Sequence, residues 1–196
     1  MIIIFGMAGS GKSTQGDRLA EKFGMKWLSV GQVLRETGKF DEILKEGKLV
    51  DDETVIELMD RQIEKCEAEG FNVILDGYPR DEVQAQHMAE TMAGKIDGAI
   101  MLEVPEEELW KRIELRGRAD DTREALKRRF EIFEQNIYSI LKLLGEKGVK
   151  AEKVDGTGTM DEVEARLTEV VKRLVPGVSE QIEDVNGGEI ERSYGE

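Results

Sequence analysis

A glycine-rich segment near the start of the chain carries the first chemistry that the sequence suggests. Residues 6–13 fit the spacing G-x-x-x-x-G-K-[ST], in which glycines let backbone N–H groups turn inward around phosphate oxygens. Lys12 can bridge the β- and γ-phosphates of a nucleoside triphosphate, and the Ser13 hydroxyl can ligate Mg²⁺. The motif follows an apolar run and opens a helical pattern, whose N-terminus favours the same anion. The expected contacts come from Gly9, Ser10, Gly11, Lys12, Ser13 and Thr14.

A second polar segment follows the apolar run 71–75. Residues 76–80 read Asp-Gly-Tyr-Pro-Arg. In an open α/β sheet, ligands bind beyond the carboxyl ends of the strands, so Asp76 is expected beside the glycine-rich loop, where it can hold a magnesium-bound water. Arg80 would then face the mouth of the cleft. A turn or a helix cap is the ordinary alternative for an aspartate at the end of a strand.

Positive charge is concentrated in one part of an otherwise acidic chain. The net charge is −14, which argues against general nucleic-acid binding. Residues 111–129 nevertheless contain eight lysines and arginines against four acids. Such a run is often only a solvated helix face, but a phosphate site in an acidic protein needs local positive charge.

The elements that must position these residues alternate between strands and helices. Apolar runs predict five strands, at residues 1–5, 25–28, 71–75, 98–104 and 149–154. Helical spacing predicts helices at residues 12–23, 31–36, 40–46, 52–69, 81–93, 106–115, 121–145 and 160–174. This alternation is typical of an α/β fold with a five-stranded parallel sheet flanked by helices, as in P-loop NTPases.

Composition limits the other functions open to the chain. With one cysteine, Cys66, and one histidine, His87, no internal disulfide can form, and a protein-built zinc site is close to excluded. Both residues are expected to serve packing or a helix surface. The longest apolar run, 1–5, is too short to cross a bilayer. We therefore expect a cytoplasmic protein without nucleic-acid or membrane partners, monomeric by default or a small homo-oligomer.

The order and spacing of these motifs resemble the adenylate kinase family, whose close relative is UMP/CMP kinase. The resemblance runs from residue 1 to about 174. It implies a single P-loop kinase domain over 1–174, with a nucleoside monophosphate (NMP)-binding insertion at about 29–58 and a vestigial lid at about 116–118. Residues 175–196 remain as an acidic tail, either flexible or a docking segment. The motifs that carry the resemblance are residues 6–13, 28–35, 47–50, 76–80 with Gln84, and 117–121 with Arg129.

The resemblance also implies roles on the acceptor side. Arg35 and Arg80 match the arginines that grip the phosphate of AMP, and Gln84 matches the glutamine that hydrogen-bonds its adenine. The remaining positions that match the AMP pocket are Lys48, Leu49, Val50, Gly77, Tyr78, Arg118 and Arg129.

The resemblance implies a reversible transfer of a phosphoryl group from Mg·ATP to AMP, giving two ADP. Arg112, Arg116 and Gly158 match positions that contact ATP. The matching catalytic residues are Lys12, Arg116, Arg118 and Arg129. The chemistry agrees, because such a transfer needs two anionic substrates held in line and charge neutralised between them. Arginine suits this task, since its planar fork binds phosphate oxygens in pairs and stays charged.

The sequence departs from the family pattern at four places. Ala8 replaces a usual proline, and Ser13 replaces a usual glycine while adding a possible Mg²⁺ ligand. Val30 replaces a threonine that borders the AMP base. The insertion between Arg35 and Gly47 has room for about one short helix. Finally, only Gly117 lies where relatives have a lid loop or domain, so ATP could hydrolyse without acceptor, or a neighbouring subunit could cover the site.

Three alternative functions remain open at this point. The nearest is the same transfer to CMP or UMP, which Val30 favours, whereas Gln84 favours adenine. A P-loop ATPase that acts as a switch or sensor would leave residues 76–80 and Gln84 without an explanation. A kinase for a small non-nucleotide metabolite would need no base pocket, so residues 48–50 and Gln84 argue against it.

Overall fold

The computed structural model describes residues 1–118 and 120–181, which form an α/β fold around one parallel sheet. The strand order is β2-β3-β1-β4-β5, so the central strand is the one that precedes the glycine-rich loop. The order changes direction at this strand, and open sheets bind ligands at such a point, beyond the carboxyl ends. The strands are β1 (Ile2–Phe5), β2 (Lys26–Ser29), β3 (Val73–Asp76), β4 (Gly98–Glu103) and β5 (Ala151–Asp155).

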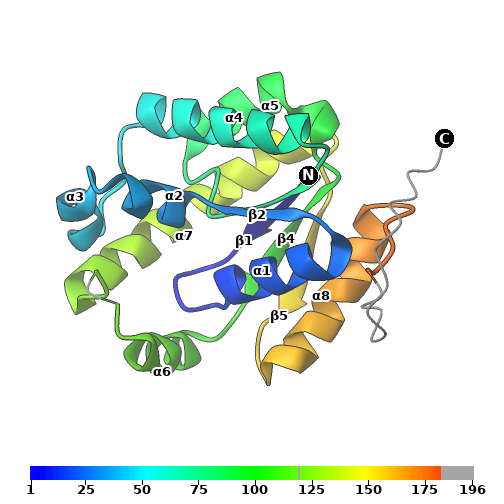
Figure 1. The fold of residues 1–196 in the computed structure, drawn as a ribbon. Helices are drawn as coiled ribbons and strands as arrows, with labels where there is room; N and C mark the ends of the chain where they lie inside the picture. The colour runs from blue at the N-terminus through cyan, green and yellow to red at the C-terminus, as the bar shows by residue number, and fades with distance from the viewer. Residues whose placement is uncertain (119, 182–196) are drawn as a thin grey trace.

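Helices cover both faces of the sheet (Figure 1). One face packs against α1 (Lys12–Phe23) and α8 (Met160–Leu174). The opposite face packs against α4 (Asp52–Ala68), α5 (Glu82–Thr91) and α7 (Arg123–Glu146). The remaining helices are α2 (Val30–Thr37), α3 (Asp41–Lys45), the short 3₁₀ helix η1 (Ala93–Lys95) and α6 (Glu106–Arg116).

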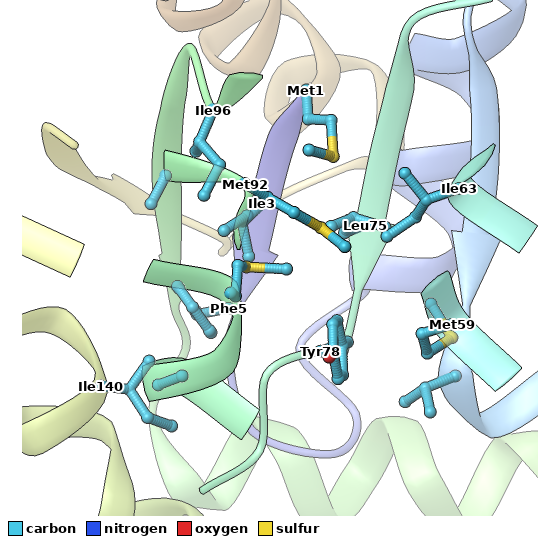
Figure 2. Close-up of a cluster of buried hydrophobic side chains, with 14 of the residues drawn as sticks. Met1, Ile3, Phe5, Met59, Ile63, Leu75, Tyr78, Met92, Ile96 and Ile140 are labelled. Carbon is cyan, nitrogen blue, oxygen red and sulfur yellow. The ribbon is translucent and has the colours of Figure 1, made fainter. Parts of the chain in front are cut away.

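The central strand is apolar at every position because it contributes to two cores. Side chains alternate between the faces of a strand, so Ile3 and Phe5 point to one face and Ile2 and Ile4 to the other. Figure 2 shows Ile3 and Phe5 in the core on the face covered by α4, α5 and α7, which also contains Met59 of α4. Burial on both faces fixes β1, and with it the position of the loop that follows.

The expected five strands and eight α-helices are present, but three of the four strands that follow a helix begin later than the apolar runs suggest. In each case a glycine with positive φ ends the preceding helix, at Gly24, Gly70 and Gly148. The residue after each glycine then donates its N–H to a carbonyl five residues back, as in a Schellman motif. These residues, Met25, Phe71 and Val149, therefore close helices rather than open strands.

Two boundaries expected from the sequence can be compared with the structure. The limit of the insertion at about residue 58 falls inside α4, which continues without interruption to Ala68. The tail prediction can be followed only to residue 181, where the Gln181 N–H donates to the carbonyl of Lys22 at 2.7 Å. The rest of that segment, 182–196, lies outside the described residues. Within the described ranges, no helix has the length and apolarity needed to cross a membrane.

Candidate active site

A cavity of about 540 Å³ lies at the carboxyl edge of the sheet, a volume suited to small-molecule ligands. Segments distant in the sequence share its wall. They are the glycine-rich loop, the start of α2, the segment after α3, the loop after β3, the arginines of α6 and α7, and the loop after β5. Basic side chains on this wall include Lys12, Arg35, Lys48, Arg80, Arg112, Arg116, Arg118 and Arg129.

The glycine-rich loop forms one end of the cavity, and its backbone geometry depends on glycine. Gly9 and Gly11 have φ values of 85° and 96°, a region that costs other residues strain. A Cβ on Gly9 would also lie 2.8 Å from the side chain of Ile113 on α6. Ser10, Ser13 and Thr14 share this wall with the two glycines, as the sequence predicts.

Lys12 lies in the loop with its ammonium group pointing back along it. Its Nζ donates to the carbonyl of Met7 at 2.8 Å. Burial lowers the pKa of Lys12 to about 8, while the nearby Asp76 carboxylate opposes that shift. The charged form is therefore favoured by any further anion that enters the cavity, such as a phosphate.

Ser13 and Asp76 lie side by side beneath the loop. The Ser13 Oγ donates to the Asp76 carboxylate at 2.7 Å, and Asp76 is only 3% exposed at the end of β3. A hydroxyl and a buried carboxylate are hard oxygen ligands of the kind Mg²⁺ takes, directly or through water. The residues present therefore fit the expected magnesium site.

Two arginines converge on another part of the cavity wall. A Cβ on Gly31 would lie 3.4 Å from the guanidinium groups of both Arg35 and Arg80, so both lie over this glycine. The Nε of Arg80 donates to the carbonyl of Gly77 at 2.8 Å, which fixes its direction. Burial lowers the pKa of Arg80 to about 10, which leaves it charged at neutral pH. Two convergent guanidinium groups can grip one phosphate.

A third group of arginines lines the same cavity and is held by two neighbouring acids. Arg116 forms a bidentate pair with Asp121 at 2.9 and 2.7 Å. Arg129 donates to Asp120 at 2.7 Å, and Arg35 lies 3.7 Å from the same carboxylate. Burial alone would raise the pKa of Asp120, but the hydrogen bond and charge of Arg129 lower it. Asp120 and Asp121 thus join arginines from three segments.

Arg118 also lines the cavity. Burial lowers the pKa of Arg118, and the charges of Arg116 and Arg35 lower it further. A concentration of like charge of this kind favours an anion at its centre.

The end of α3 rests directly on the start of α7. Arg129 donates to the carbonyl of Leu44 in α3 at 2.8 Å, and Arg128 donates to that of Glu46, the residue that ends the helix, at 3.1 Å. Gly47 has a φ of 69°, and a Cβ there would lie 2.3 Å from the carbonyl oxygen of Ala125. Figure 1 shows α3 beside the first turns of α7. Leu44 and residues 47–49 therefore line the cavity where α3 meets α7.

The remaining predicted residues divide into two sets. Arg112 lines the cavity while paired with Glu108 at 2.9 Å, and Lys48, Leu49, Gly77 and Gly158 also line it. Val50, Tyr78 and Gln84 are 3%, 0% and 1% exposed and lie behind the wall rather than on it.

Four residues of this site carried no predicted role. Asp120 and Asp121 appear in the sequence only as acids within a basic run, and their spacing does not reveal which arginines they hold. Asp52 and Asp81 start helices, where acids are common as caps, so their sequence signal is that of a helix start. Only the tertiary structure brings both of them to Gln84.

Comparison with known proteins gives a consistent result. A family model described as adenylate kinase matches residues 4–149. The adenylate kinase of Thermus thermophilus is 35% identical over 181 residues, covering 85% of this chain and 94% of that protein. The adenylate kinase of Phocaeicola vulgatus is 35% identical over 188 residues, covering 88% and 98%. The adenylate kinase of Micrococcus luteus is 34% identical over 186 residues, covering 87% and 89%.

Proposed function

Because the chain belongs to the adenylate kinase family and is a nucleoside monophosphate kinase, we propose that it transfers a phosphoryl group reversibly from Mg·ATP to AMP, giving two ADP. One observation carries the proposal: a single cavity is lined by the phosphate-binding loop, by two arginines that converge over Gly31, and by further arginines from α6 and α7. Two phosphate sites with positive charge to neutralise the transferring group are what transfer between two phosphorylated substrates requires.

The donor is assigned to the end with the glycine-rich loop. The backbone N–H groups of residues 9–14 and the Lys12 ammonium would surround the β- and γ-phosphates. Arg112 and Gly158 lie on the same part of the wall and would contact the rest of ATP. Ser13 and Asp76 would hold Mg²⁺, which supplies charge neutralisation for the phosphate oxygens when bound.

The acceptor is assigned to the opposite end. Arg35 and Arg80 would bind the phosphate of AMP, and Lys48 and Leu49 would line its pocket next to Gly77. Val50, Tyr78 and Gln84 form the layer behind, from which Gln84 would contact the base.

Charge on the transferring group would be neutralised by Lys12, Arg116, Arg118 and Arg129. Asp121 and Asp120 hold Arg116 and Arg129. Phosphate oxygens would compete with these carboxylates for the same guanidinium groups. No general base is needed, because the attacking oxygen of AMP is already ionised at neutral pH.

The organisation of the chain follows from these roles. We assign residues 1–174 to one kinase domain, residues 29–58 to the acceptor-binding insertion and residues 116–118 to a vestigial lid. The contact of the insertion with α7 supports a closed site formed within one chain, so we expect a monomer. We place the activity in the cytoplasm.

A coupled assay with Mg·ATP and each of AMP, CMP, UMP and GMP tests the proposal, with a control that contains no acceptor. Strong turnover with AMP alone is the expected result. A preference for CMP or UMP would support the second candidate, a pyrimidine nucleotide kinase, which the buried Val30 beside Gly77 favours. Equal phosphate release with and without acceptors would overturn the kinase assignment.

The same control measures the effect of the reduced lid. If the insertion excludes water from the cavity as its contact with α7 suggests, ATP hydrolysis without AMP will be a small fraction of turnover with AMP. Hydrolysis at a comparable rate would mean that the short insertion leaves the transferring group open to water.

A further inference from the structure

Gln84 is a buried amide whose hydrogen-bonding groups are nearly all engaged. Its Nε2 donates to the Asp52 carboxylate at 2.8 Å and to the Asp81 carboxylate at 3.1 Å. Its Oε1 accepts from the backbone N–H of Arg80 at 2.9 Å. A carboxamide has two N–H donors and two acceptor lone pairs. One lone pair on Oε1 is therefore the single group left for a further partner.

The direction of this amide is determined by its partners. Turning it over would place the NH₂ group against the N–H of Arg80, donor against donor. It would also place the oxygen against two carboxylates, acceptor against acceptor. Each such contact leaves buried polar groups without partners, which is strongly disfavoured. Gln84 is therefore held with its oxygen toward the loop after β3, which lines the acceptor end of the cavity.

The two aspartates come from the two segments that form this end of the cavity. Asp52 begins α4, directly after residues 47–50, and Asp81 caps α5, directly after residues 76–80. Asp81 also accepts from the backbone N–H of Gln84 at 3.0 Å. Burial, and then the hydrogen bond and charge of Asp52, raise the pKa of Asp81 to about 6. Two carboxylates placed this close together repel each other unless they share hydrogen-bond donors. The Nε2 group of Gln84 donates to both of them.

We propose that Asp52 and Asp81 are positioning residues that lock Gln84 as a hydrogen-bond acceptor toward the acceptor base, so that the site selects bases with an exocyclic amine. Adenine and cytosine donate from such an amine, whereas six-oxo purines and uracil present a carbonyl at the same place. An amide free to turn could serve either kind of base. The inference rests on the proposed function, since it places the base of the acceptor next to Gln84.

The sharpest test compares AMP with inosine monophosphate, which differs in this one substituent. The wild-type chain, Asp52→Asn, Asp81→Asn and the double variant would each be assayed with Mg·ATP, and kcat and KM determined for both acceptors. Asparagine keeps the size of aspartate and caps helices well, so both helix starts are preserved. It can also donate, which removes the acceptor-against-acceptor penalty for turning Gln84 and leaves only the contact with the N–H of Arg80 to oppose the turn. Asp51→Asn is the matched control, because Asp51 caps α4 through Thr54 and is the immediate neighbour of Asp52.

We expect the wild type to prefer AMP, and the ratio of kcat/KM for AMP over inosine monophosphate to fall about tenfold in the double variant. Asp51→Asn should keep the wild-type ratio. The same two substitutions made in a Gln84→Leu background should leave the ratio of that background unchanged, because the aspartates act through Gln84.

Three results would overturn the inference: an unchanged ratio in the double variant, an equal fall in Asp51→Asn, or an equal fall in the Gln84→Leu background. The last two would mean that the aspartates act on the local structure in general. Failure of the proposed function is distinct, because it would appear as absence of AMP turnover in the wild type.

Discussion

The two ends of the cavity are built in different ways. The phosphate-binding loop of the donor end is one continuous segment, whose shape comes from backbone angles at Gly9 and Gly11. The acceptor end is formed by side chains from several segments, which are held by acids and backbone carbonyls far away in the sequence. A site formed by backbone groups can be recognised from consecutive residues of the sequence. A site formed by side chains depends on contacts that arise only in the folded chain.

The difference extends to how firmly each end is preorganised. The Lys12 ammonium and the Ser13 hydroxyl are held by Met7 and Asp76 within the loop and the adjacent strand. At the other end, Arg129 is shared among Asp120, Asp121 and the carbonyl of Leu44. A substrate phosphate must draw Arg129 from these partners, so we expect the acceptor end to adjust on binding more than the donor end does.

Removing the charged group of the donor end should have the largest effect. Lys12→Ala should lower kcat by about a thousandfold, because it removes a buried positive charge from the transferring phosphoryl group. Steady-state kinetics with Mg·ATP and AMP measure this effect. Lys22→Ala is the matched control, since Lys22 lies on the same helix but pairs with Glu164 away from the cavity. A loss below tenfold in Lys12→Ala would contradict the assignment of the donor end.

A comparison of two neighbouring arginines of α7 can distinguish a role in catalysis from a role in contact with the insertion. Both Arg128 and Arg129 donate to carbonyls at the end of α3, but of the two only Arg129 also lines the cavity. Arg129→Ala should lower kcat by about a hundredfold, because a guanidinium group beside the transferring oxygens is lost. Arg128→Ala should lower it less than threefold. Similar losses in the two variants would mean that Arg129 acts mainly by holding the insertion.

Substitution of Gly47, which lies close to Ala125, tests whether the insertion affects the acceptor site without affecting the donor site. Gly47→Ala should raise KM for AMP about tenfold and leave KM for ATP nearly unchanged, because the new methyl group would push the insertion away from Ala125. Gly38→Ala is the matched control, since Gly38 has a similar φ of 65° but no atom of residues 1–118 or 120–181 within 4 Å of an added Cβ. Each substitution carries the backbone strain of about 1–2 kcal/mol, but only the first carries the clash. An equal rise in KM for ATP would show that the two ends are not independent.

The same contrast explains what the sequence could predict. The strands, the helices and the glycine-rich loop follow from local patterns, and the structure confirms the elements. The late starts of β2, β3 and β5 depend on Schellman bonds after a glycine, which an apolar run alone does not reveal. At the acceptor end, Arg35 and Arg80 came from a family resemblance, and the structure brings both onto Gly31.

The roles of the acids that hold the acceptor end could not be predicted from the sequence. An aspartate in the first turn of a helix reads as a cap whether or not it also holds an arginine or an amide across the cavity. Asp52 therefore gains its partner only where α4 meets α5. Asp120, an acid within a basic run, gains its partners only where it meets Arg35 of α2 and Arg129 of α7.

The smallest predicted effect concerns the acid pair behind the acceptor end. The folded-state pKa of Asp81 is about 6 against an ordinary value of 3.8, so proton uptake favours folding. Asp81 therefore lowers stability above about pH 6, and this penalty disappears as the pH falls toward 4. Asp81→Asn keeps the helix cap and removes the charge, so it should raise the free energy of unfolding by about 1 kcal/mol at pH 7.5, a value reduced for partial exposure. Denaturant unfolding between pH 4 and 8 measures the difference.

Asp51→Asn is the control for this measurement because its effect should have the opposite sign. Hydrogen bonds from Thr54 lower the pKa of Asp51, so its carboxylate favours folding above about pH 4 and stops doing so as the pH falls further. At pH 7.5 the Asp51 variant should therefore be less stable than wild type, while the Asp81 variant is more stable. If both variants lost stability at pH 7.5, Asp81 would be an ordinary helix cap. The acid pair would then not be a strained element that distinguishes the acceptor end from the donor end. At the donor end, the acid Asp76 lies beside Lys12 and Ser13.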